Sequence, residues 1–90
     1  MKAKLVLPEE FDDYYAWEVE EKGVFFRATA KLDGREIPLT FYNPIRLAQD
    51  IEEEFRSRHS MAISNLVIVQ RVTRDNMTAA VEAMGPEFFG

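Results

Sequence analysis

Residues 24–42 read VFFRATAKLDGREIPLTFY, and this stretch decides the fold because it contains two alternating strands joined by a two-residue turn. Apolar residues occupy every second position from Val24 to Leu32, as expected of a strand with one buried face, and Phe25 is the one exception. Asp33-Gly34 favours a type I′ turn, in which both central residues take positive φ. The alternation resumes after the turn at Ile37, Leu39 and Phe41. We therefore predict a β-hairpin over these residues.

The two-residue turn determines which residues face each other across the hairpin. Leu32 faces Arg35, and the neighbouring pair of Lys31 and Glu36 carries opposite charges. The pairs predicted on the inner face are Ala30–Ile37, Ala28–Leu39 and Phe26–Phe41, and those on the outer face are Thr29–Pro38, Arg27–Thr40 and Phe25–Tyr42. Proline has no N–H to donate, so we predict that its strand, 35–42, forms an edge of the sheet.

The composition is that of a small acidic domain. Ninety residues suit one domain, and a content of 47% hydrophobic and 30% charged residues excludes wholesale disorder. There is no cysteine, so disulfides and thiolate metal sites are excluded and a reducing compartment is favoured. No apolar run is long enough for a signal peptide or a membrane span, and we expect a cytoplasmic protein without membrane contact. The net charge of −5 argues against binding to nucleic-acid backbones.

The residues before the hairpin permit two interpretations. Residues 3–7 form a short apolar run that suits a strand ending at Pro8. In residues 16–21, alternation favours a strand that pairs with 24–32. The alternative is a helix, because Phe11, Tyr15 and Val19 share a helical spacing and Gly23 could end it.

Two helices and one strand follow the hairpin. Asn43-Pro44 is a helix start, and the helix should run to about Ser57 with an apolar face that contains Leu47, Ala48, Ile51 and Phe55. A loop at 59–64 precedes a strand at 65–72. A second helix should begin after Thr73 and stop at Gly85-Pro86, leaving Phe88 and Phe89 either docked on the domain or part of a contact surface.

These elements predict an α+β fold. We expect a two-layer sandwich in which a mostly antiparallel sheet of four or five strands carries two helices on one face, with the chain order β-β-β-β-α-β-α. Because 35–42 is predicted to be an edge, the strand at 65–72 should join the far side of the sheet, beside 16–21 or 3–7.

The sequence contains no convincing catalytic or metal-binding set. A metal-dependent nuclease would need carboxylates converging from several elements, and none lies between Leu66 and Val72. His59 is the only histidine, and no cysteine can act with it as a nucleophile. We therefore expect no cofactor, no metal and no enzyme activity, with a hydrolase as the least favoured function.

Two candidate binding sites remain. The first is an interface on the open outer face of the sheet, where Phe25 and Tyr42 are expected to face each other; its residues are Phe25, Arg27, Thr40, Tyr42, Val67 and Val69. The second is an anion or phosphate site at the start of the second helix, made of Arg71, Thr73 and Arg74. The first site indicates a protein-interaction module, with a homodimer as one form of it, that binds through this face or through an edge strand. The second site indicates a protein that binds a small anionic ligand.

Overall fold

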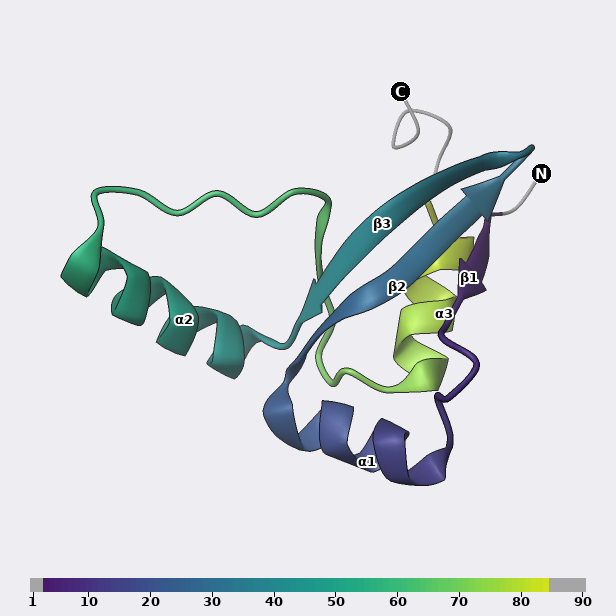
Figure 1. Ribbon diagram of the computed structural model, residues 1–90, viewed down its shortest axis with the longest axis horizontal. Coiled ribbons are helices and arrows are strands. Elements are labelled where there is room, and N and C mark those ends of the chain that lie inside the picture. The colour runs from purple at the N-terminus through teal and green to yellow at the C-terminus, as the bar shows by residue number, and fades with distance from the viewer. Residues whose placement is uncertain (1–2, 85–90) are drawn as a thin grey trace.

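The computed structural model describes residues 3–84 and confirms the α+β class (Figure 1). The sheet has four strands in the order β1-β2-β3-β4, and no fifth strand is present in residues 3–84. Strands β1, β2 and β3 pair antiparallel, whereas β4 runs parallel to β3. In chain order the elements are β1 (Lys4–Val6), α1 (Asp13–Lys22), β2 (Val24–Leu32), β3 (Arg35–Tyr42), α2 (Pro44–Ser57), β4 (Leu66–Ile68) and α3 (Arg74–Glu82).

Helix α1 replaces the strand that we favoured over residues 16–21, so that prediction is wrong and the helical alternative is correct. The Asp12 side chain caps the helix by accepting a hydrogen bond from the Tyr15 N–H at 2.8 Å. Gly23 ends it in the left-handed conformation, with φ of 74°, and donates its N–H to the Val19 carbonyl. The alternation over residues 16–21 favoured a strand. The caps at both ends, together with the helical spacing of the apolar residues, outweigh it.

The hairpin has the predicted turn, and its register is as predicted from Leu32–Arg35 to Ala28–Leu39. Both turn residues have positive φ, 48° at Asp33 and 81° at Gly34. Beyond Ala28 a β-bulge shifts the register by one residue, so Phe25 faces Phe41 and the predicted pairing of Phe25 with Tyr42 is wrong. The shift turns Phe25 into the core, where it is 4% exposed, and leaves Phe26 69% exposed.

Strand β4 lies beside β3, and the prediction that it joins the far side of the sheet is wrong. It pairs only with residues 40–42, at the end of β3 that lies beyond Pro38. The edge predicted from the proline therefore exists along residues 35–39 alone. Strand β4 is also shorter than predicted, because it ends at Ile68 rather than at Val72.

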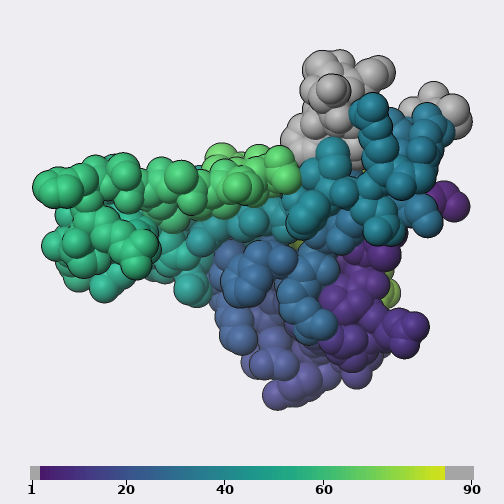
Figure 2. Space-filling model, turned by 45° about the horizontal axis from the view of Figure 1, so that its top comes forward, coloured from purple at the N-terminus to yellow at the C-terminus, as the bar shows by residue number. Residues whose placement is uncertain are grey.

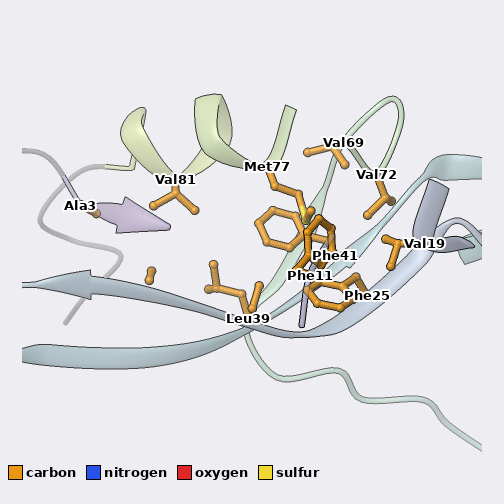
Figure 3. Close-up of a cluster of buried hydrophobic side chains, with 12 residues drawn as sticks. Ala3, Phe11, Val19, Phe25, Leu39, Phe41, Val69, Val72, Met77 and Val81 are labelled. Atoms are coloured by element: carbon orange, nitrogen blue, oxygen red, sulfur yellow. The ribbon is translucent and has the colours of Figure 1, made fainter. Parts of the chain in front are cut away.

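The core lies between the sheet and helices α1 and α3 (Figure 3). Helix α3, capped by Thr73 as predicted, directs Met77 and Val81 onto Leu39 and Phe41 of the sheet. The aromatic ring of Phe25 meets those of Phe11 and Tyr15 with centroids 5.4 and 5.8 Å apart. The predicted stop at Gly85-Pro86 and the placement of Phe88 and Phe89 lie outside the described residues.

Helix α2 has the predicted bounds but does not cover the sheet. It projects away from the other elements, and residues 58–65 run back beside it to β4 (Figures 1 and 2). None of its fourteen residues is buried. We call residues 44–65 the arm, and the rest of the described chain the body.

Candidate interaction surface

One side of the arm is an apolar groove. Helix α2 contributes a stripe at four-residue spacing, and the returning segment and the start of β4 form the opposite wall. The space-filling view shows this segment lying along the helix (Figure 2). The groove has a volume of about 220 Å³ and is lined by Leu47, Ile51, Phe55, Met61, Ile63 and Leu66.

The apolar residues of the arm remain in contact with solvent. Phe55 is 56% exposed and Ile51 is 38% exposed, although both line the groove. Ile45, at the first turn of α2, is 72% exposed. Because contiguous apolar surface of this kind marks interaction sites in soluble proteins, the groove is the strongest candidate site in the described chain.

The returning segment is extended and lacks regular pairing. The structure gives residues 59–62 no hydrogen bond to any other part of the described chain. Met61 and Ile63 alternate with the exposed residues Ser60, Ala62 and Ser64, so the segment has the apolar pattern of a strand without a neighbouring strand. Its free backbone groups are available to a partner as well as to water.

The arm is attached to the body at a well-bonded joint. The Asn43 N–H donates to the Gly23 carbonyl at 2.9 Å, and the Asn43 side chain caps α2 by accepting from the Arg46 N–H at 2.7 Å. Gly23 allows this close approach, because a Cβ at this position would lie 2.5 Å from the Asn43 side-chain nitrogen. Arg46 also donates to the Lys22 carbonyl at 3.1 Å. The direction of α2 is therefore set by the end of α1.

Tyr42 and Asp50 form the second part of this joint. The Tyr42 hydroxyl donates to one carboxylate oxygen of Asp50 at 2.7 Å, and Arg46 donates to the other at 2.9 Å. Burial, followed by the hydrogen bond to Asp50, raises the pKa of Tyr42 to about 12. This contact connects the sheet to the middle of the helix.

At its other end the arm is held by Asn65. This residue has a left-handed backbone, with φ of 54°, and its side chain donates to the Pro38 carbonyl at 2.9 Å. Its own carbonyl accepts from the Thr40 N–H at 3.2 Å. Asn65 thus satisfies backbone groups of β3 at the point where β4 begins, and both ends of the arm are anchored to β3.

The six predicted interface residues are not brought together on one exposed surface. Phe25 and Val69 belong to the buried core, and Val67 packs partly buried against it. Tyr42 is buried at the joint, and Thr40, two residues earlier in β3, is half-buried and pairs with Leu66 of β4. Arg27 donates to Tyr15 at 3.0 Å and to Glu10. That these six form an interface stays a prediction, and the large apolar residues exposed on the strands are instead Val6, Phe26 and Ile68.

The predicted anion residues do lie together at the start of α3, and each has a protein partner. Arg74 donates to the Phe11 carbonyl at 2.9 Å and stands over the Phe11 ring at 5.2 Å. Arg71 pairs with Glu20 at 3.3 Å, and Thr73 caps the helix by accepting from the Asn76 N–H. An anion site here stays a prediction without a further observation in its favour.

Neither a metal cluster nor a membrane-spanning helix is found within residues 3–84. No group of three or more His, Asp or Glu side chains in that range could hold a metal ion. No helix there is long and apolar enough to cross a bilayer. Comparison with protein-family models, with curated proteins and with solved structures gives no match for this chain.

The arm is the feature that sequence reasoning missed. Its apolar stripe was recognised, but it was assigned to the core because amphipathic helices usually cover a sheet. The one signal that could have located it is the alternation of Met61 and Ile63 in the segment predicted to be a connecting loop.

Proposed function

We propose that this protein is a small cytoplasmic interaction module that binds a protein partner through the apolar groove of its arm. The observation that carries the proposal is helix α2, which has a continuous apolar stripe and no buried residue. A monomer that left such a stripe in water would forgo about 25 cal/mol for every Å² of apolar area it failed to bury. A partner that covers the groove recovers this free energy.

The position of the groove fits a binding role. Leu66 belongs both to the groove and to β4, and Ile68 continues the exposed apolar surface two residues further along the same strand. The arm therefore extends the open outer face of the sheet, which the sequence analysis favoured as the binding surface. The joint at Tyr42, Asp50 and Arg46 holds the helix in one direction, so less conformational entropy is lost when a partner binds.

A capture experiment with matched variants tests this function. Immobilised wild-type protein, an Ile51→Asp/Phe55→Asp variant and a Gln49→Asp control are compared for the proteins, including further copies of this chain, that they retain from a native cell extract. Gln49 is exposed on the same helix and does not line the groove. We expect the control to retain what the wild type retains and the double variant to lose it.

The double variant should remain folded, because neither substituted residue is buried. Its denaturation midpoint serves as the check. The proposal is refuted if the folded double variant captures the same proteins as the wild type, or if the wild type neither captures a protein nor associates with itself.

A further inference from the structure

We propose that the partner is a second copy of this chain, and that two arms pack groove against groove about a two-fold axis. This inference rests on the function proposed above and names its partner. The groove comes from one continuous segment, Leu47–Leu66, so every copy presents the same apolar patch. A surface that meets its own equivalent by two-fold symmetry closes into a dimer and leaves no copy of the patch exposed.

The chain exposes more surface than an average monomer of its mass, and contact between two arms would cover part of it. Folded monomers of 10.4 kDa expose roughly 5,400 Å² on average. This chain exposes 6367 Å², which is about 1,000 Å² more. Each partner in a stable protein complex buries about 800 Å². The radius of gyration is 13.6 Å, whereas a compact chain of this length has roughly 12 Å. The chain is therefore less compact than an average domain of its size.

Charge does not oppose contact between two arms. Of the net charge of −5, residues 44–65 carry only −1, from three arginines and four acids, and the rest of the chain carries −4. Each acid of α2 also has an arginine three or four residues away: the pairs are Arg46–Asp50, Arg56–Glu52, Arg56–Glu53 and Arg58–Glu54. Because these acids are paired within their own arm, two arms that meet add little charge repulsion.

The helix itself indicates where the axis lies. Helix α2 has fourteen residues and is about 21 Å long, and its apolar stripe at Leu47, Ile51 and Phe55 is centred on Ile51. If two such helices cross antiparallel at their centres, the two Ile51 side chains meet near the axis. Each Leu47 then lies near the Phe55 of the second copy. A stripe at four-residue spacing is the ridge that helices use when they pack at about −50°.

Sedimentation equilibrium on the purified chain tests the dimer. We expect the wild type to be dimeric at about 100 µM, and Ile51→Asp to raise the dissociation constant by about 30-fold or more, as loss of a central contact does. The matched control Gln49→Asp should change it by less than about 3-fold. A wild type that is monomeric at this concentration overturns the inference, as does an Ile51→Asp protein that dimerises as tightly as the wild type.

Cysteine cross-linking tests the position of the axis, and the cysteine-free chain makes each introduced thiol unique. Under mild oxidation Ile51→Cys should form a disulfide-linked dimer, and Gln49→Cys, on the opposite side of the helix, should not. Cross-linking of Gln49→Cys in preference to Ile51→Cys overturns this arrangement. A monomeric wild type that still captures another protein through its arm refutes the inference and leaves the proposed function in place.

Discussion

Helix α2 of the arm and helix α3 of the body are both amphipathic, but they differ in how far their apolar residues are buried. Helix α3 has nine residues, of which Met77 and Val81 are completely buried against the sheet. Helix α2 has fourteen residues and a longer apolar stripe, and none of them is buried. Amphipathic spacing thus predicts that a helix forms and which side is apolar, but it does not predict what covers that side.

The difference should also appear in local stability. An isolated helix of about fourteen residues is marginal in water, so a helix without buried contacts depends on its caps and on its joint. In α2 these are the Asn43 cap, the Pro44 start and the Asp50 contacts. We therefore expect the arm of a monomer to exchange its amide hydrogens well before the body does.

The largest expected effect comes from truncating a large aromatic residue in each region. Phe41→Ala removes a ring that is fully buried, and we expect the free energy of unfolding to fall by about 3–5 kcal/mol. Phe55→Ala removes a ring that is 56% exposed, and in the monomer the loss should be below about 1 kcal/mol. Urea denaturation of both variants, at protein concentrations low enough to keep the chain monomeric, measures the two values.

Raising the protein concentration sharpens this comparison. Dimerisation would add stability to the wild type by mass action, and Phe55→Ala should lose much of that addition. Equal losses for the two variants at low concentration would show that the arm is packed as firmly as the body, contrary to the structure.

The sequence was sufficient for the elements whose signals are local. The turn at Asp33-Gly34, the start of α2 at Asn43-Pro44 and the Thr73 cap each depend on a few adjacent residues, and all three were predicted correctly. The register was correct up to Ala28 because the two-residue turn fixes it.

The errors arose where long-range packing decides the outcome. Phe25 and Phe26 are equally apolar, and the choice between them depends on a bulge that brings Phe25 to Phe11 and Tyr15. Tyr15 belongs to α1 and Phe11 lies just before it, so the contacts of Phe25 could not be foreseen once residues 16–21 were assigned to a strand. The candidate site was missed for a related reason, because no local pattern in residues 44–57 indicates whether the helix folds back onto the sheet.

An intermediate effect is expected at Gly23, where the arm joins the body. Gly23→Ala combines two costs, because its φ of 74° is unfavourable for alanine and the new Cβ would lie 2.5 Å from the Asn43 side chain. We expect a loss of about 2–3 kcal/mol in the free energy of unfolding, together with faster hydrogen exchange in α2.

Gly34→Ala is the matched control for this substitution. Its φ is 81°, but a Cβ there would meet nothing within 4 Å, so only the backbone cost of about 1 kcal/mol applies. If the two variants lose the same stability and α2 exchanges unchanged in both, the close approach of Gly23 and Asn43 does not hold the arm.

The smallest of the three effects, and the most specific, concerns the hydrogen bond from Tyr42 to Asp50. Tyr42→Phe removes it without removing the ring, and we expect a loss of about 1 kcal/mol at neutral pH. The pKa of Tyr42 is about 12 in the folded chain against an ordinary value of 10.0. Because the folded value is the higher one, the neutral hydroxyl stabilises the fold fully below pH 10, and this stabilisation is lost as the pH rises from 10 to 12.

The stabilities of wild type and Tyr42→Phe should therefore converge over that range. Urea denaturation at a series of pH values measures the gap, and the difference in tyrosinate absorbance between the two proteins reports the ionisation of Tyr42 directly. A gap that is constant up to pH 12, or a Tyr42 that ionises near pH 10, would contradict the buried contact. In either case the sheet would lose its contact with the middle of α2, and the arm would be oriented by the Gly23–Asn43 contact, the hydrogen bond from Arg46 to the Lys22 carbonyl, and Asn65.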